Sequence, residues 1–308
     1  MRWEKGICWF RRDLRVFDNR ALSEATRHCK SVYTVFIFDT CIIGGLKKND
    51  RRMSFIWASV EELKQKIKDK GGRLITLYGD PKNLIPRLAR SLRVDAVFAG
   101  EDYEPKSIER DEAVRRKLES EQQRLILLKD HVVHTPVEVL KDDGSAYRVF
   151  TPYSKVWKKR VSIDLVSIAR LGQGVLKKTK LPSDDFKSPR SLASIGFEEQ
   201  KLKFDPGESS GRKTFNKFKS KIDSYHKLRD FPAEDGGSHL SVYLRFGNIS
   251  IRELVRFCLK ENSAGISVWL NELIWREFYM MILFQFPHVV GNSFLPKYQH
   301  IVWSGSDE

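Results

Sequence analysis

Cysteines, histidine clusters and long apolar runs are scarce in this sequence, and each scarcity excludes a class of protein. The four cysteines among 308 residues include no Cys-x-x-Cys pair, so we expect reduced thiols in a cytoplasmic protein rather than a disulfide scaffold. His131 and His134 have no further cysteine or histidine nearby to complete a zinc site, which predicts that no metal is bound. No apolar run is long enough to cross a membrane, and the charged first residues do not resemble a signal peptide. A soluble protein that is not exported is expected.

Acidic residues are outnumbered: 40 aspartates and glutamates face 55 lysines and arginines, for a formal net charge of +15. A field of this sign favours polyanionic partners, with nucleic acid first and an anionic membrane second. A generally basic surface without a specific partner remains an alternative at this point.

The first half of the chain alternates short β-branched or aromatic runs with segments of helical periodicity. Such alternation is typical of parallel βαβ units, and it predicts an α/β fold with a doubly wound parallel sheet. Ligands of these sheets bind beyond the carboxyl ends of the strands, and "FRRDLRVFDN" follows the first run directly. The expected strands span residues 6–10, 31–39, 73–78, 96–100 and 125–128.

Beyond this part the pattern changes twice. Residues 163–212 are rich in serine, glycine, proline and charge, and so long an irregular stretch is unusual inside a domain. We therefore expect an α/β domain over 1–134, an interdomain connector over 135–212 and a helical domain over 213–308. Apolar residues recur at helical spacing between 212 and 232, with lysines on the other face. Those lysines form either a solvated face or a surface that follows phosphates.

Two stretches of the helical part could carry chemistry. "GGSHLS" (236–241) offers hydroxyls and backbone amides of the kind that bind phosphate, although a plain turn explains it equally simply. In "WLNELIWREFY" (269–279), Trp269, Glu272, Arg276 and Tyr279 share one helical face. They form either a buried helix with a Glu272–Arg276 ion pair, or a pocket wall for an extruded nucleobase with Trp275 at its border.

Four segments together resemble the photolyase/cryptochrome family, in family order and across essentially the whole chain. The form of the last segment is most similar to class I cyclobutane pyrimidine dimer photolyases (deoxyribodipyrimidine photolyases). The segments are "CWFRRDLRVFDNRAL", "YRVFTPYSKVWKKR", "RDFPAEDGGSHLSVYLRFGNIS" and "SVWLNELIWREFY".

This resemblance implies an antenna domain followed by a helical domain that binds FAD. The implied activity is that of a DNA repair lyase: photoexcited, reduced FAD donates an electron to a flipped-out cyclobutane pyrimidine dimer, the ring splits and the electron returns. UV-damaged DNA is then the partner of a monomeric protein. A cryptochrome-type blue-light photoreceptor without repair and an inactive truncated photolyase remain alternatives.

The resemblance also implies roles for individual residues. Glu272 and Trp275 would receive the dimer as catalytic residues, and Trp303 would be the outermost tryptophan of the chain that reduces the flavin. FAD would be bound by Tyr225, Gly237, Ser238, His239, Leu240, Ser241, Trp269 and Arg276, and DNA by Arg229, Glu272, Trp275, Arg276 and Tyr279.

Three departures from the family pattern affect these expectations. Gly237 stands where the family usually has a threonine of the phosphate loop. Ser107, beside Lys106, stands near the position of a glutamate that binds a folate antenna, so a folate or a deazaflavin type of second chromophore is left open. The family continues through further helices after the segment that matches residues up to 308, and an incomplete FAD-binding domain is therefore expected.

Overall fold

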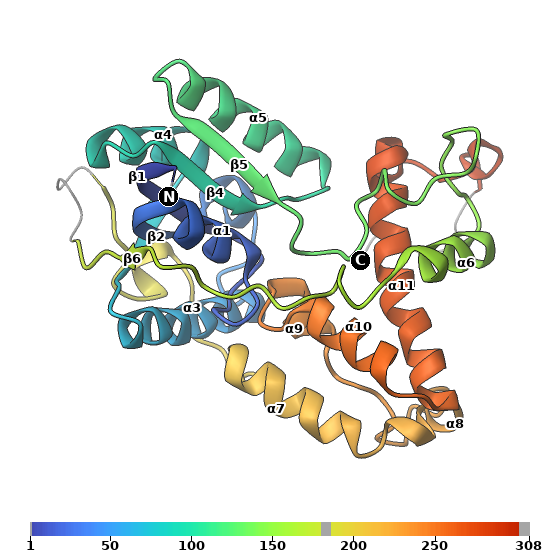
Figure 1. Cartoon of the computed structure of the whole chain (residues 1–308). Coiled ribbons are helices and arrows are strands. Elements are labelled where there is room, and N and C mark those ends of the chain that lie inside the picture. Colours follow the sequence, from blue (N-terminus) through green and yellow to red (C-terminus); the bar gives the residue numbers. More distant parts are fainter. Residues whose placement is uncertain (1, 180–185, 302–308) are drawn as a thin grey trace.

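The computed structural model describes residues 2–179 and 186–301, and its first part is built around a parallel sheet (Figure 1). The strand order is β3-β2-β1-β4-β5, and every pairing along it is parallel. The order reverses at β1, so the sheet is doubly wound, as predicted. The strands are β1 (Trp3–Phe10), β2 (Cys29–Asp39), β3 (Leu74–Gly79), β4 (Ala96–Gly100) and β5 (Arg124–Leu128).

Helices cover both faces of this sheet. In β1, Cys8 and Phe10 face one core, whereas Ile7 and Trp9 face the other, because successive side chains of a strand point to opposite faces. The first core is closed by α1 and α3 and the second by α4 and α5, and a short α2 follows β2. These helices are α1 (Arg20–His28), α2 (Thr40–Ile43), α3 (Arg51–Asp69), α4 (Pro81–Leu92) and α5 (Pro105–Glu119).

The segment 135–212 carries more regular structure than its composition indicates. Helix α6 (Phe150–Arg160) buries Tyr153 and Trp157 in the core of the helical part. Further on, β6 (Val175–Leu176) pairs with β2, and the 3₁₀ turn η1 (Ala193–Ile195) packs on the sheet core. The segment thus contacts both parts, and its boundaries as a connector stay a prediction.

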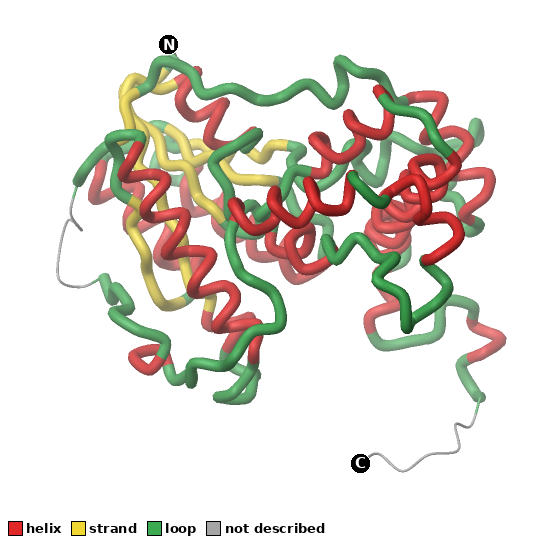
Figure 2. The backbone as a smooth tube through the Cα atoms, turned by 90° about the horizontal axis from the view of Figure 1, so that it is seen from below, coloured by secondary structure: helices red, strands yellow, loops and turns green. Residues whose placement is uncertain are grey.

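The helical part is built on α11, which is largely apolar and packs against α6, α8 and α10. Figure 2 shows the strands on one side of the molecule and a group of helices on the other. The apolar pattern of 212–232 is divided between α7, η2 and α8 instead of forming one helix. None of the helices in the described ranges is long and apolar enough to cross a membrane. The elements are α7 (Glu208–Lys219), η2 (Ile222–Ser224), α8 (Tyr225–Leu228), α9 (Ser241–Phe246), α10 (Ile251–Lys260), α11 (Ala264–Gln285), η3 (Pro287–Val290) and η4 (Pro296–Tyr298).

A buried charge cluster joins the two parts. Arg252 of α10 donates hydrogen bonds to Asp18, which follows β1, and to Asp130, which follows β5. Arg15 pairs with Asp130 at 2.6 Å, and the four side chains are at most 2% exposed. Two positive and two negative charges balance, which makes such deep burial of charge tolerable. The cluster fixes α10 against the carboxyl edge of the sheet.

Candidate functional site

A cavity of about 420 Å³ opens where α11 passes α8 and α9. We call it the helical pocket. It collects side chains from the loop after β1, from the "GGSHLS" stretch and from one face of α11. Its lining consists of Arg12, Tyr225, Ser238, Ser241, Leu244, Arg245, Trp269, Glu272, Leu273, Arg276 and Met280.

One face of α11 supplies a wall of this pocket. Of the four residues that the spacing placed on one face, Trp269, Glu272 and Arg276 line the pocket and Tyr279 does not. Arg276 is held there because it donates a hydrogen bond to the backbone oxygen of His131 at 2.7 Å. Burial lowers the pKa of Arg276 to about 10, and at neutral pH the guanidinium remains charged. The pocket therefore keeps a fixed positive charge at its base.

Glu272 pairs with Arg229 and not with Arg276. The Nη1 atom of Arg229 lies 2.5 Å from Oε1 of Glu272, and the two side chains are 31% and 34% exposed. The hydrogen bond to Glu272 raises the pKa of Arg229. The alternative of a Glu272–Arg276 ion pair within α11 is thus wrong, because the end of α8 brings Arg229 to the carboxylate. Within the described residues, Oε2 of Glu272 accepts no hydrogen bond.

Aromatic packing fixes the position of Trp269. Its ring stacks on Phe215 with centroids 5.8 Å apart and leans on Phe218 at 5.0 Å. Tyr225 meets Phe218 edge to face, and burial raises the pKa of its phenol. These two residues therefore form a rigid, neutral aromatic side of the helical pocket.

Only part of the loop 237–241 faces the pocket. Ser238 and Ser241 line it, whereas Leu240 is 1% exposed and packs in the core. His239 has φ of 55° and lies 2.7 Å from Oδ1 of Asp235. Gly237 is open, since an added Cβ would meet only the His239 ring, at 3.8 Å.

Trp275 lies outside the lining of the helical pocket. Its ring is stacked on Phe150, the first residue of α6, with centroids 3.7 Å apart and planes at 6°. Tyr279 stacks on Trp275 at 5.4 Å and is 62% exposed. The structure thus separates Trp275 and Tyr279 from the pocket and joins them in an aromatic stack. Trp303 lies outside the described residues.

Several lining residues were missed by the sequence reasoning. Arg12 belongs to the quoted stretch after the first strand, so its position at a carboxyl strand end was the available signal. The sequence around Arg245 of α9 carries no comparable signal, because no pattern near it along the chain indicates that it lies close to Arg12. Leu244, Leu273 and Met280 looked like ordinary core residues of their helices.

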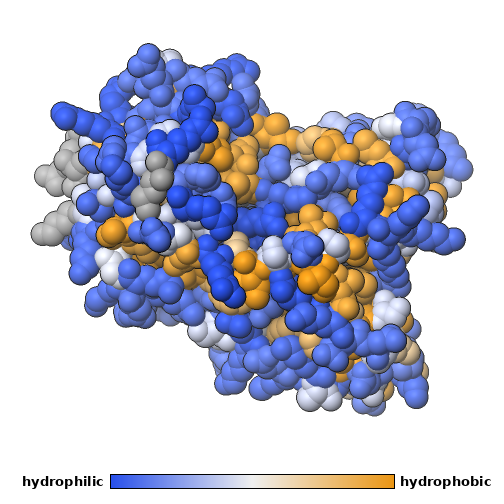
Figure 3. Space-filling model, viewed as in Figure 1, coloured by the Kyte–Doolittle hydropathy of each residue, from blue (hydrophilic) through white to orange (hydrophobic). Residues whose placement is uncertain are grey.

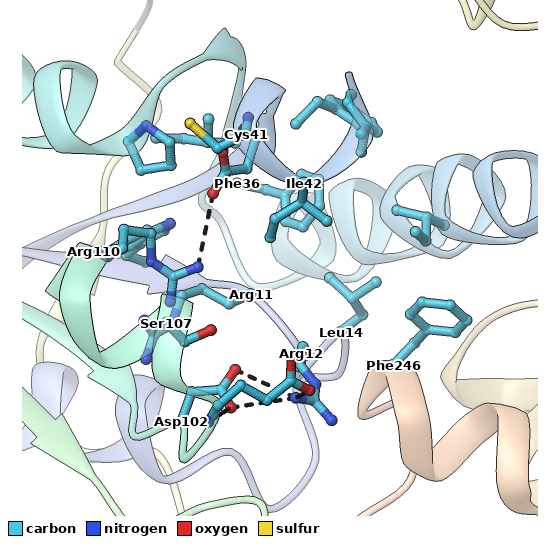
Figure 4. A pocket seen from close by; sticks show the side chains of 18 of the residues that line it. Arg11, Arg12, Leu14, Phe36, Cys41, Ile42, Asp102, Ser107, Arg110 and Phe246 are labelled. Atoms are coloured by element: carbon cyan, nitrogen blue, oxygen red, sulfur yellow. Dashed lines mark hydrogen bonds and ion pairs between the residues drawn. The ribbon is translucent and has the colours of Figure 1, made fainter. Parts of the chain in front are cut away.

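A second cavity, of about 350 Å³, lies at the carboxyl ends of β1, β2 and β4. We call it the sheet pocket. Figure 4 shows Arg110, Ser107 and Asp102 on one side of it and Ile42, Leu14 and Phe246 on the other. Ser107 and Lys106, which the sequence singled out, both line this cavity. A planar molecule with an apolar face and a polar edge suits such an arrangement.

The charges around the sheet pocket are largely paired with one another. Asp111 accepts from Arg11 at 2.5 Å and from Arg110 at 2.9 Å. Burial raises the pKa of Asp102, but Arg12 and other nearby cations outweigh burial, so that the net shift is downward. Asp102 is therefore ionised, and the charges are mostly paired, although Nε of Arg11 has no hydrogen-bond partner among the described residues.

The two pockets share a wall. Arg12 and Arg245 line both cavities, and Oε1 of Glu104 accepts from Arg12 at 2.6 Å and from Arg245 at 2.8 Å. Arg245 is 55% exposed at its side chain. The wall between the two pockets is thus an ion network in which Arg245 is the cation that faces solvent.

The donor set of the helical pocket fits FAD. Two hydroxyls, of Ser238 and Ser241, and the guanidinium groups of Arg12 and Arg245 suit a pyrophosphate. The rings of Tyr225 and Trp269 provide apolar surface for a flat ring system. Of the residues that the sequence assigned to FAD, Tyr225, Ser238, Ser241, Trp269 and Arg276 line this pocket, whereas Gly237, His239 and Leu240 do not.

Known proteins with similar sequences are photolyases for the most part. The chain is 30% identical to a deoxyribodipyrimidine photo-lyase of Synechococcus sp. (strain ATCC 27144 / PCC 6301 / SAUG 1402/1), over 98% of this chain and 65% of that protein. It is also 30% identical to an uncharacterized 31.6 kDa protein of Synechococcus sp. (strain PCC 6716), over 90% of this chain and 100% of that protein. The chain spans about 65% of the length of the curated photolyases it matches.

Solved structures agree with this relationship. The archaeal photolyase from Sulfolobus tokodaii superposes with a TM-score of 0.79 at 29% identity, covering 97% of this chain and 64% of that one. The class III photolyase from Agrobacterium tumefaciens shares the fold with a TM-score of 0.83 at 24% identity, over 98% of this chain and 64% of that one. The family model for DNA photolyase matches residues 6–171. With its doubly wound sheet, its helical pocket and this match over more than half of its length, the chain belongs to the DNA photolyase family.

Proposed function

We propose that the protein acts in light-driven repair of cyclobutane pyrimidine dimers, with FAD in the helical pocket. The observation that carries the proposal is the wall of the helical pocket formed by α11. There the Trp269 ring, the Glu272 carboxylate and the Arg276 guanidinium line one cavity beside the hydroxyls of Ser238 and Ser241. Photoexcited, reduced FAD would supply the electron that splits the dimer. The residues of this chain would bind, orient and exclude water.

Glu272 would accept a hydrogen bond from the flipped-out pyrimidine. Its Oε2 is available, and its Oε1 is held by Arg229. Both partners are about one-third exposed, and ion pairs in such positions contribute only about 0–1 kcal/mol. The pair can therefore open, so that Arg229 turns to a phosphate of the DNA while Glu272 keeps its contact with the base.

Trp275 can stack on a base only if Phe150 or Tyr279 moves away from its ring. The Phe150–Trp275 contact is closely parallel, and aromatic pairs of this kind contribute about 0.5–1.5 kcal/mol. Stacking of a nucleobase on an aromatic side chain contributes about 1–3 kcal/mol. A base can therefore replace Phe150 with little or no net loss, and we propose that Phe150 keeps the Trp275 ring covered until DNA binds.

The sheet pocket would hold the second chromophore. Its apolar side and its ring of internally paired charges favour a large planar molecule over a small ion. The Sulfolobus tokodaii photolyase is described with two FAD molecules, with the implication of a novel light-harvesting cofactor. A flavin thus joins the folate and deazaflavin types as a candidate, and the absorbance spectrum of extracted chromophore distinguishes the three.

The proposal is tested with the purified full chain. We expect a flavin absorbance band close to stoichiometric amount, and loss of dimers from a UV-irradiated oligothymidylate under blue light but not in the dark. Chromatography of the oligonucleotide measures the loss. Flavin and DNA binding without dimer loss would indicate a photoreceptor. A protein that takes up no flavin after incubation with FAD would contradict the proposal altogether.

A further inference from the structure

Helix α7 turns a cationic side away from the helical core. Phe215 and Phe218 are 2% and 1% exposed and pack on Trp269, so the opposite side of α7 faces away from the helical pocket. Positions three and four residues apart share a helix face. On the outer side this places Ser209, Arg212, Lys213, Asn216 and Lys217 together, with no carboxylate among them.

These residues form one wall of a groove, and Lys66 of α3 forms the other. The cavity between them measures about 610 Å³. Through Lys66 it continues into a second cavity, of about 670 Å³, that Lys70 and Arg170 also line. In Figure 3 hydrophilic residues cover the lower edge of the molecule, where Figure 1 places α7. We call the whole feature the basic groove; its cations are Lys66, Lys70, Arg170, Arg212, Lys213 and Lys217.

Carboxylates neutralise part of the groove. Lys66 lies 3.5 Å from Glu62 and 3.6 Å from Glu208. Arg212 lies 3.3 Å from Glu253, and Asp69 lines the second cavity. Glu208 accepts from the backbone N–H groups of Val16 and Phe17, and Asp18 belongs to the buried cluster with Arg252. By contrast, Lys213 and Lys217 pair with no acidic residue in the part of the chain that the structure describes. Within the described residues, no ion pair therefore cancels the charge of Lys213 and Lys217 on the α7 wall.

The two walls are fixed relative to each other. Oε1 of Glu62, on α3, accepts from the backbone N–H of Ser209 at 3.0 Å and from its hydroxyl at 2.7 Å. Gly207 has φ of 96°, and any side chain there would collide with Glu62. The first turn of α7 is thus capped by the protein itself, so an anion in the groove would be held by side chains rather than by the helix end.

We propose that the basic groove binds the phosphodiester backbone of nucleic acid, at a second contact separate from the helical pocket. Lysine, arginine, serine and asparagine are the side chains that contact phosphates in such complexes, and here they recur along α7 at each helical turn. A membrane-binding helix would instead present apolar residues beside its cations, and the outer side of α7 has none. This contact does not require that the protein repairs DNA.

The test measures binding of undamaged, fluorescein-labelled duplex DNA by the full-length chain as salt is raised. Each phosphate contact contributes about 0.9 to the slope of log K against log salt. Replacing Lys213→Gln together with Lys217→Gln should therefore lower the slope by about 1.8 and weaken binding roughly tenfold or more at 0.15 M salt. The matched control is Lys47→Gln with Lys48→Gln, which removes the same charge from an exposed loop and should leave the slope unchanged.

Equal slopes for both double variants would overturn the proposal, since only net charge would then matter. If the Lys213/Lys217 double variant lost binding to phosphatidylserine vesicles while its DNA binding stayed intact, the groove would bind a lipid surface and the proposal would be wrong. Acetylation of the unaltered protein provides a second measurement, in which DNA should protect Lys213 and Lys217 but not Lys47 and Lys48. A preference for dimer-containing over undamaged DNA, if the proposed repair function holds, should be the same in both double variants. Absence of any such preference would count against repair and not against the groove.

Discussion

The sheet pocket and the helical pocket differ in how their charges are satisfied. Around the sheet pocket, Arg11 and Asp111 pair at 2.5 Å with side chains only 7% and 5% exposed. In the helical pocket, the Arg229–Glu272 pair is equally short but about one-third exposed. A ligand of the sheet pocket would therefore meet charges that are mostly paired already. A ligand of the helical pocket could replace Arg229 as the partner of Glu272.

The difference follows from the elements that build each site. Parallel strands place their carboxyl ends side by side, so charged residues there meet one another in a buried setting. Helices α8, α9 and α11 line the helical pocket and leave several of their polar groups partly exposed. In the proposed function, the sheet pocket would therefore select a ligand mainly by shape, and the helical pocket mainly by polar contacts.

The largest expected effect is on the free energy of unfolding, and it compares the loss of a buried cation with the loss of an exposed one. Arg252→Met should lower the free energy of unfolding by about 3–5 kcal/mol, because it leaves the buried Asp18 without its paired cation and Asp130 with Arg15 alone. Arg229→Met removes an exposed pair and should cost less than about 1 kcal/mol. Urea unfolding measures both. Similar losses for the two variants would show that burial does not distinguish the two sites.

The next effect is a dependence of the stability on pH, which comes from the buried His131. Burial lowers its pKa to about 3, with Arg12 and Arg276 acting in the same direction against Asp102 and Asp130. Since the unfolded value is about 6.5, the unfolded chain binds more protons between pH 6.5 and 3. Stability is therefore full above pH 6.5 and falls as the pH is lowered, by about 3 kcal/mol at pH 4.

The variant His131→Asn checks this dependence. Unfolding in urea at pH 7 and pH 4 should show a smaller loss for the variant than for the unaltered chain, whatever their stabilities at pH 7. An unchanged difference between the two pH values would assign the acid sensitivity to other groups, such as His134, whose pKa burial lowers to about 4.

A smaller pair of effects concerns the aromatic stack beside the helical pocket. Trp275→Ala should weaken binding of a dimer-containing oligonucleotide by about 1–3 kcal/mol, since it removes the stacking surface. Phe150→Leu should strengthen it by up to about 1 kcal/mol, because the ring that covers Trp275 is lost. Fluorescence anisotropy measures both. Weaker binding by the Phe150 variant would mean that Phe150 supports the base instead of yielding to it.

The smallest expected effect restores a hydroxyl to the loop 237–241. Gly237→Thr fits without a clash, and one added hydrogen bond to the FAD pyrophosphate should tighten binding by about 1 kcal/mol. Titration with FAD measures the gain. Gly291→Thr, equally open but away from the pocket, is the control and should change nothing. An equal gain in both variants would argue against a phosphate contact at this loop.

Much of the fold could be predicted from sequence, and less of the site. The five strand runs were found because buried strands have a distinct composition, and the α/β class is confirmed. The helix over 212–232 was not foreseen as broken, since its apolar spacing continues across the turn at Ile222. The partner of Glu272 could not be found, because Arg229 lies 43 residues away along the chain. The assigned roles of the site residues stay predictions.

The sequence by itself determined the family, the doubly wound sheet and the face of α11 that lines a pocket, because periodicity and motif order are local properties of the chain. Only the tertiary structure decided that Arg12 and Arg245 share a wall, that Phe150 covers Trp275, and that the lysines of α7 line a groove with α3. Each of these depends on the distance between elements far apart in sequence. Such distances are set by how the two cores pack together, which no local pattern records.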